Sequence, residues 1–401
     1  MIITRLFALA LLASSGSGLA LPFTPFTGFE PTSQSFIVKL KPGHSCQSHF
    51  SRIKGSLGKV ESGRATHFDS RIFNGYAIQL DDQATIKSLS LLDSVEYIEP
   101  DTVFSVASLM TQTDAPWGLQ AITRSIAFPI SNESSLALNY KYEYDTSAGQ
   151  GVDIYILDSG VYSNHTDFAN RVEHSPVFAR YTTTGDVFGH GTHVAGIAAG
   201  TRFGVAKQAR IIDVKVITDT GRGFASDIIA GLSWAVAHAN STGRPSVFNL
   251  SLGGGTSSAL DDAVMGVVNA GIHTVVAAGN AAADINTTDW SPARVPGVIA
   301  VGNVDLNGVR SKTSNYGSPV ALFAPGVNIT SAGINGPTSS RVDSGTSMAA
   351  PHVAGLVAYL TGLEGLRTPP EMKTRVQALA RADILSDIPN GTVNLMSQNT
   401  L

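Results

Sequence analysis

Beyond Gly149 the chain alternates between short apolar runs rich in β-branched residues and longer segments with helical spacing. This alternation is typical of a parallel sheet covered by helices on both faces, because strands buried on both sides read as continuous apolar runs. We therefore predict one doubly wound, mostly parallel α/β domain over residues 109–401. Its expected strands are residues 152–157, 211–217, 247–252, 272–277, 298–301 and 320–323, and its expected helices are residues 226–238, 260–270, 346–360 and 370–380.

Residues 35–101 carry a different pattern, which predicts a small two-layer α+β module with a ferredoxin-like order of elements. The expected strands are residues 36–40, 75–80 and 95–98. A polar helical stretch follows the first strand, and a helix is expected over residues 82–92. From Glu99 to Thr113 the sequence is small, polar and aperiodic, so we expect a cleavable linker with a boundary near residue 108.

The N-terminus has the layout of a secretory signal peptide, with Arg5, an apolar run over residues 6–13 and small residues up to Ala20. The alternative, a membrane anchor, needs about 20 continuous apolar residues. We predict a signal over residues 1–20, a propeptide over residues 21–108 and a secreted product. Secretion also fits seven glycosylation sequons, of which Asn249 lies inside an expected strand; the others are Asn132, Asn164, Asn240, Asn286, Asn328 and Asn390.

Composition narrows the choice of function. Lys and Arg total 27 against 31 Asp and Glu, so the net charge of −4 gives no basic surface for nucleic acid. Hydrophobic residues make up 43% of the chain, which argues against disorder. Cys46 is the single cysteine, so the chain has no intramolecular disulfide.

Four polar elements stand at the ends of expected strands or at the starts of expected helices, where a parallel sheet exposes its functional groups. Asp158 follows the strand over residues 152–157, and Asn280 follows the strand that ends at residue 277. The other two are His190, in the run Gly-His-Gly-Thr-His-Val-Ala-Gly, and Ser347, in the run Ser-Gly-Thr-Ser-Met-Ala-Ala-Pro-His.

Each element also has a plain structural interpretation. Asp158 and Asn280 could be turn residues, and Ser347 could be a helix N-cap. His190 and His193 could share a metal on one helix face, but no Cys or Glu nearby completes that site.

Taken together, the four groups supply what acyl transfer requires. Ser347 is a nucleophile that needs a base, His190 accepts its proton, Asp158 stabilises the imidazolium, and the amide of Asn280 donates to an oxyanion. A rival interpretation is the nucleophile elbow of the α/β-hydrolases, nearly matched by residues 345–349. That fold needs its His well after the Ser, and only His352 follows, on the same predicted helix.

The chain order Asp, His, Ser is that of subtilisin. On these motifs the chain resembles the subtilisin-like serine proteases, and among them the secreted proteinase K group; residues 115–119 and 391–395 extend the resemblance. It implies that Asp158, His190 and Ser347 are a catalytic triad, and that Asn280 and the backbone N–H of Ser347 form the oxyanion hole. It also implies that residues 35–101 are an inhibitory propeptide that assists folding.

The resemblance further implies where a peptide substrate binds. Two segments flank the substrate as an added β-strand, and the primary pocket lies between the second of them and a third. None of the pocket residues is charged, so we expect an apolar or aromatic residue before the cleaved bond. These segments are Gly221-Arg222-Gly223, Ser251-Leu252-Gly253 and Ala277-Ala278-Gly279.

The chain departs from the proteinase K pattern at three positions. Val194 stands where that group often has a free cysteine. Ala321 and Ile384, with Asp383 beside it, stand where the group has the carboxylates of two calcium sites. Because hard cations prefer carboxylate oxygens, these two departures argue against calcium there, and no cofactor is expected for catalysis.

We expect a monomer whose partners are protein substrates and its own propeptide, with no nucleic acid or membrane partner. The alternative is a catalytically silent relative that uses its cleft only for binding. All four groups are present, which argues against it.

Overall fold

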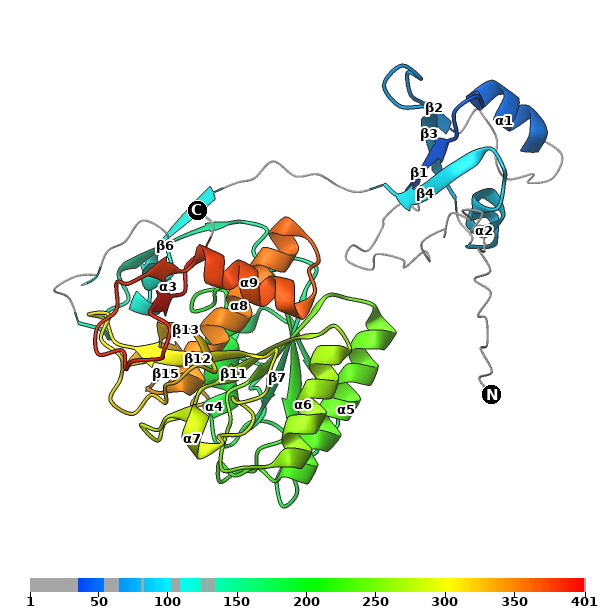
Figure 1. Ribbon diagram of the computed structural model, residues 1–401. Coiled ribbons are helices and arrows are strands. Elements are labelled where there is room, and N and C mark those ends of the chain that lie inside the picture. Colours follow the sequence, from blue (N-terminus) through cyan, green and yellow to red (C-terminus); the bar gives the residue numbers. More distant parts are fainter. Residues whose placement is uncertain are drawn as a thin grey trace, which may run out of the picture. The chain divides into compact units, whose positions relative to one another are not determined.

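The computed structural model describes residues 35–53, 65–80, 83–101, 109–123, 128 and 134–399. The described chain divides into two compact units, one within residues 30–104 and the other within residues 105–401 (Figure 1). The signal predicted for residues 1–20, the sequon at Asn132 and the boundary predicted near residue 108 lie outside the described residues.

The N-terminal unit is an antiparallel four-stranded sheet with the order β2-β3-β1-β4, accompanied by two helices. Side chains of β1 alternate between half-buried and buried, as a sheet with one covered face requires. The α+β prediction is confirmed, and β2 is an addition that its exposed, three-residue sequence did not signal. The elements are β1 (Ser35–Leu40), α1 (Cys46–Ile53), β2 (Ala65–His67), β3 (Gly75–Gln79), α2 (Gln83–Ser90) and β4 (Val95–Pro100).

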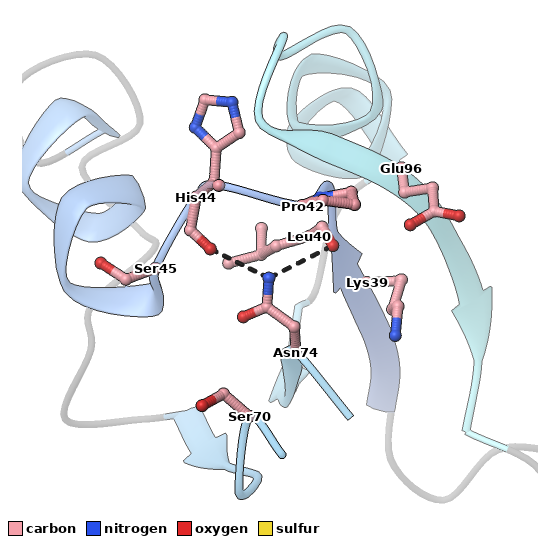
Figure 2. A pocket seen from close by; sticks show the side chains of 9 residues that line it. Lys39, Leu40, Pro42, His44, Ser45, Ser70, Asn74 and Glu96 are labelled. Carbon is pink, nitrogen blue, oxygen red and sulfur yellow. Dashed lines mark hydrogen bonds between the residues drawn. The ribbon is translucent and has the colours of Figure 1, made fainter. Parts of the chain in front are cut away.

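A shallow hollow at one end of this unit is held together by an asparagine amide (Figure 2). Nδ2 of Asn74 donates to the carbonyl oxygens of His44 at 2.9 Å and Leu40 at 3.4 Å, which ties down the turn after β1. Its other lining residues come from β1 (Lys39), from β4 (Glu96) and from the turns that hold residues 42–45 and Ser70.

The C-terminal unit is built on a nine-stranded sheet. Its neighbouring strands are parallel except for the β16–β17 pair. Every residue of the five strands from β13 to β7 is buried, which explains their continuous apolar sequences. In sheet order the strands are β16 (Arg381–Ala382), β17 (Leu395–Met396), β13 (Val320–Pro325), β12 (Ile299–Val304), β11 (His273–Ala277), β10 (Ser246–Leu250), β7 (Asp153–Asp158), β9 (Arg210–Lys215) and β8 (Val172–His174).

Helices cover both faces of this sheet, as predicted. α4 and α8 pack against each other and against the central strands, whereas α5 and α6 form a separate layer (Figure 1). The helical segments are α3 (Trp117–Ala121), a 3₁₀ turn at Thr166–Phe168, α4 (His190–Ala199), α5 (Ala225–Thr242), α6 (Ser258–Asn269), α7 (Ile285–Thr288), α8 (Thr346–Glu364) and α9 (Pro369–Leu379). No helix among the described residues is long and apolar enough to cross a membrane.

Two antiparallel pairs lie outside the main sheet: β5 (Leu109–Ala115) with β6 (Tyr140–Asp145), and β14 (Ile329–Ala332) with β15 (Ser340–Asp343). The expectation that the linker continues to Thr113 was wrong at its end, because β5 is already a paired strand there. Its side chains are mostly exposed, so it lacks the apolar alternation by which a strand is recognised.

Candidate active site

The groups singled out from the sequence gather at one edge of the large sheet. β7, β10 and β11 run parallel, so their carboxyl ends lie together. Asp158 is the last residue of β7, and Ser251 and Asn280 follow β10 and β11. His190 is the first residue of α4, and Ser347 is the second residue of α8, so two helices also begin at this edge.

The structure joins Asp158 to His190. Nδ1 of His190 lies 2.8 Å and 3.0 Å from the two carboxylate oxygens of Asp158, and this geometry requires Nδ1 to carry the proton. Oδ1 of Asp158 also accepts the N–H of Ser159 at 2.7 Å. Because the Asp158 side chain is 1% exposed and the His190 side chain 21% exposed, the carboxylate is shielded while the far side of the imidazole stays accessible.

The charge around His190 favours its protonated form. Burial lowers the pKa of His190, but the attraction of Asp158 and its hydrogen bond outweigh burial, with further contributions from Asp343 and Asp186. The pKa of His190 is therefore raised above its ordinary value.

Ser347 is bound to the end of β10. Its hydroxyl donates to the carbonyl oxygen of Ser251 at 3.1 Å, and the hydroxyl of Ser251 donates to the carbonyl oxygen of Ser347 at 2.8 Å. Among the described residues no hydrogen bond joins Ser347 to His190. The Ser347 hydroxyl must therefore turn away from Ser251 before it can pass a proton to the imidazole.

Pro351 explains why the Ser347 carbonyl is available to Ser251. A residue four positions along a helix normally donates its N–H to this carbonyl, but proline has none. The freed acceptor takes the Ser251 hydroxyl instead, and Ser251 in turn accepts from Nδ2 of Asn249 at 3.0 Å. The start of α8 is thus tied to β10.

Asn280 presents a free amide N–H₂ group beside the start of α8. Its Oδ1 accepts the N–H of Thr346 at 2.9 Å and the Thr346 hydroxyl at 3.1 Å. Nδ2 donates to no described residue, and the residue is exposed. With the N–H of Ser347 in the first turn of α8, this amide makes a place suited to a negatively charged oxygen.

The segments expected to contact substrate border the same edge. Residues 221–223 are exposed in a turn closed by a 2.8 Å bond from the Thr218 N–H to the Arg222 carbonyl. In the wall segments, residues 251–253 change from buried to exposed, while residues 277–279 are buried. The indole of Trp290 lies against both walls: an ideal Cβ built on Gly253 or Gly279 would come 2.7 Å or 2.5 Å from its Nε1.

Sequence reasoning did not single out Trp290 or Asp186, which both lie in this region. Trp290 carries no motif that would single it out. Asp186 caps α4: its carboxylate accepts the N–H groups of Gly189 at 2.7 Å and Thr192 at 2.9 Å, and the Ser159 hydroxyl at 2.9 Å. Asp186 lies four residues ahead of the first helical residue, outside the N-cap position, so the usual capping pattern does not single it out.

The metal interpretation of the His pair does not fit the contacts of His193. This side chain is buried, and its Nε2 donates to the carbonyl oxygens of Ile329 at 3.0 Å and Arg341 at 3.1 Å. Burial lowers its pKa to about 4. Among the described residues no three His, Cys, Asp or Glu side chains form a metal cluster.

The two positions compared with calcium sites hold no carboxylate. Ala321 is buried in β13, and its carbonyl oxygen accepts from Nε2 of Gln377 at 3.0 Å. Ile384 is 39% exposed. These residues do not fit the carboxylate-based sites of the proteinase K pattern.

The contacts of His352 do not suit a catalytic base either. It is buried, its Nδ1 donates to the carbonyl oxygen of Met348 at 2.8 Å, and burial lowers its pKa to about 4. The geometry therefore gives no support to the α/β-hydrolase alternative.

Comparison with known proteins agrees with this geometry. The profile of the Subtilase family matches residues 149–392, and that of the Peptidase inhibitor I9 family matches residues 35–107. An alkaline serine protease of Corniculantispora psalliotae is 38% identical over 400 residues, covering 99% of this chain and 98% of the relative. Subtilisin-like protease 3 of Pseudogymnoascus destructans is 42% identical over 371 residues, covering 90% and 89%.

Solved structures give the same result. The crystal structure of a cold-adapted subtilisin-like serine proteinase matches with a TM-score of 0.65 and 38% identity, covering 72% of this chain and 99% of that one. The profile match spans more than half of the chain and coincides with the unit that holds Asp158, His190 and Ser347. The chain is therefore a subtilisin-like serine protease with an N-terminal I9 inhibitor domain, and it belongs to the subtilase family.

Proposed function

We propose that the chain is a secreted serine endopeptidase, made as a self-processing zymogen, in which Asp158, His190 and Ser347 form the catalytic triad. The observation that carries the proposal is the pairing of Nδ1 of His190 with the buried carboxylate of Asp158. This pairing fixes the imidazole tautomer and leaves Nε2 free to accept a proton at the edge where α8 begins.

The reaction proceeds through an acyl-enzyme. Ser347 turns from the Ser251 carbonyl, gives its proton to Nε2 of His190 and attacks the peptide carbonyl carbon. Nδ2 of Asn280 and the N–H of Ser347 bind the oxyanion, while Asp158 stabilises the imidazolium. His190 then protonates the departing amine, and a water molecule activated by the same imidazole hydrolyses the ester.

Substrate preference follows from the walls of the pocket. Ser251–Gly253 and Ala277–Gly279 contribute no charged side chain, and Trp290 adds an aromatic surface behind two of their glycines. We expect broad specificity with an apolar or aromatic residue before the cleaved bond, because a Lys or Arg there would need a buried carboxylate. Residues 221–223 are expected to pair with the substrate backbone.

Secretion with glycosylation and action as a monomer complete the proposal. The sequons at residues 164, 240, 286, 328 and 390 are exposed, so they are accessible to glycosylation. Asn249 is fully buried in β10 and bonded to Ser251, so we exclude it as a glycosylation site of the folded enzyme. We propose that catalysis needs no cofactor and that calcium does not bind at Ala321 or Ile384.

Covalent labelling tests the proposed nucleophile. An organophosphorus or sulfonyl fluoride reagent should form one adduct, located on Ser347 by peptide mass spectrometry, because activated serine hydroxyls alone react quickly. Ser347→Ala should abolish the adduct and the hydrolysis of a peptide substrate, and His190→Ala should suppress both. Ser344→Ala, an exposed serine three residues away, is the matched control and should still label. Labelling of another serine, or hydrolysis by Ser347→Ala, would refute the triad.

Self-processing has its own test. When it is expressed in a host without other subtilases, the Ser347→Ala precursor should stay intact near residue 108, whereas the unaltered chain should be cut. The masses of the fragments give the cleavage residue. A Ser347→Ala precursor that matures when purified alone would show that another protease does the processing.

A further inference from the structure

Arg341, on β15, holds the turn that leads into α4 from both sides of His190. Its Nη1 donates to the carbonyl oxygen of Phe188 at 2.7 Å, two residues before His190. Its own carbonyl oxygen accepts from Nε2 of His193 at 3.1 Å, three residues after His190. One residue of a distant strand therefore fixes the chain before and after the imidazole.

The contact with the turn is close. Gly189 has φ +86°, a backbone conformation that favours glycine, and an ideal Cβ built on it would lie 2.8 Å from Nη1 of Arg341, so a larger residue would displace the guanidinium. The Arg341 guanidinium also lies 5.9 Å from the centre of the Phe188 ring, as a cation–π contact.

Phe188, which Arg341 holds in place, contacts two parts of the active site. Its ring lies 6.4 Å from the His190 ring, and an ideal Cβ on Gly221 would come 2.6 Å from its Cζ. Phe188 therefore fills the space between the imidazole and the segment expected to pair with substrate. A shift of this ring would move one wall of the site.

Arg341 also controls a charge near the imidazole. Its Nε lies 2.7 Å from Oδ2 of Asp343 as an ion pair, and its Nη2 donates to Oδ1 at 3.4 Å. The charged groups that act on His190 are Asp158 from β7, Asp186 from the turn before α4 and Asp343 from β15. On α4 itself, His193 interacts with His190, with Asp343 and with the Arg341 guanidinium.

We propose that Arg341 is a positioning residue for His190, which clamps the Phe188–Gly189 turn and neutralises Asp343 beside the imidazole. The inference rests on the proposed function, because it takes His190 to be the general base. Arg341 and Asp343 carry opposite charges two positions apart on β15. Removing one charge or the other should therefore shift the pH profile in opposite directions, which the loss of a purely structural contact would not do.

Arg341→Gln and Asp343→Asn should displace the acid limb of the kcat/KM profile in opposite directions. His190 must be neutral to act as base, so this limb follows its pKa. Without the guanidinium, Asp343 is uncompensated, so the pKa of His190 rises and the limb moves to higher pH. Without the Asp343 charge the limb moves to lower pH. Each shift should be roughly 0.3 to 1 pH unit for partly exposed charges.

The variant Arg341→Lys distinguishes the effect of the positive charge from the effect of the hydrogen bonds that hold the Phe188–Gly189 turn. A lysine keeps the positive charge, so the limb should return towards its original pH. It lacks the planar fork that bonds Phe188 and Asp343 together, so kcat at the pH optimum should stay reduced, by roughly 3- to 10-fold for a modest misplacement of the base. KM should change less than kcat.

Arg375→Gln is the matched control, because Arg375 forms a comparable pair with Glu364 at the far end of α8. It should leave the pH profile unchanged. Rates are normalised to the serine titrated by the sulfonyl fluoride, so a misfolded fraction does not contribute. The inference is overturned if the Arg341→Gln and Asp343→Asn limbs coincide with that of the unaltered enzyme or shift in the same direction. The proposed function fails separately, if His190→Ala keeps full activity.

Discussion

At the scale of single residues, Gly279 has to meet two demands at the wall of the pocket. Its φ of +103° is a conformation that other residues rarely adopt. An ideal Cβ there would also lie 2.4 Å from Nδ2 of Asn315 and 2.5 Å from Nε1 of Trp290. Asn315 in turn holds the backbone after Asn280, since its Oδ1 accepts the N–H of Ala281 at 3.0 Å. A methyl group at Gly279 would therefore disturb the pocket and the oxyanion donor together.

Gly279→Ala should destabilise the catalytic unit by roughly 2–4 kcal/mol, through backbone strain and overpacking. Denaturant unfolding of the sulfonyl fluoride-inactivated enzyme measures this without self-digestion. Gly266→Ala is the control, since Gly266 is exposed on α6 with nothing within 4 Å of its ideal Cβ. This control should gain about 0.5–1 kcal/mol from helix propensity. Equal stabilities of the two variants would contradict the steric argument.

Residues with a chemical signature could be assigned from sequence, and residues that act through packing could not. Asp158 and His190 could be expected to meet because the ends of parallel strands and the starts of helices share one sheet edge. Arg341 and Trp290 had no such signal. Their roles depend on contacts with segments far away in the sequence, such as Phe188 for Arg341 and Gly253 for Trp290.

At the scale of elements, the start of α4 depends on the cap that Asp186 provides. Besides two backbone N–H groups, its carboxylate accepts the hydroxyl of Thr192 at 2.6 Å. This cap sets where the helix begins, and hence where His190 lies. The negative charge is also favourable at the positive end of the helix dipole.

Asp186→Ala should lower the free energy of unfolding by about 1–2 kcal/mol and lower kcat, since the first turn that carries His190 loses its anchor. The matched control is Glu371→Ala in α9, where Thr368 and Glu371 form a capping box. This control should cost comparable stability and leave kcat unchanged. The cap would have no role in placing His190 if both variants kept full kcat.

The central strands of the large sheet could be predicted from sequence, because a strand that is buried on both faces has a continuous apolar sequence. The pairs β5–β6 and β14–β15 could not. Side chains of β15 alternate between exposed and half-buried, and its sequence Ser-Arg-Val-Asp reads as a loop. The sequence therefore does not reveal the element that holds the turn before His190.

At the scale of the whole molecule, the N-terminal unit contains a buried histidine, His49, which takes no part in the proposed catalysis. Nδ1 of His49 lies 2.7 Å from the Ser94 hydroxyl, and Nε2 lies 2.9 Å from the Tyr76 hydroxyl. Burial, with a smaller contribution from His44, lowers the pKa of His49 below its ordinary value. The folded unit therefore disfavours the protonated form, while the unfolded chain accepts the proton freely.

The stability of the inhibitor domain should accordingly fall as the pH drops below about 6.5, where the unfolded chain begins to bind the extra proton. Hydrogen exchange over residues 35–101 in the Ser347→Ala precursor, corrected for intrinsic rates, measures this loss between pH 7 and pH 5. His49→Gln should reduce the pH dependence, whatever it does to the absolute stability. His67→Gln, which alters an exposed histidine, should keep it. An unaltered pH dependence in His49→Gln would assign the effect to other groups.

The contrast between α8 and β15 indicates where this enzyme could be re-engineered. α8 is buried without a break from Met348 to Thr361, so a library of substitutions around the nucleophile would mostly yield unfolded variants. β15 is half open to solvent, and its Asp343, paired with Arg341, acts on the charge of the base. Directed evolution of the pH optimum should therefore find its tolerated changes on that strand, and leave the nucleophile helix as it is.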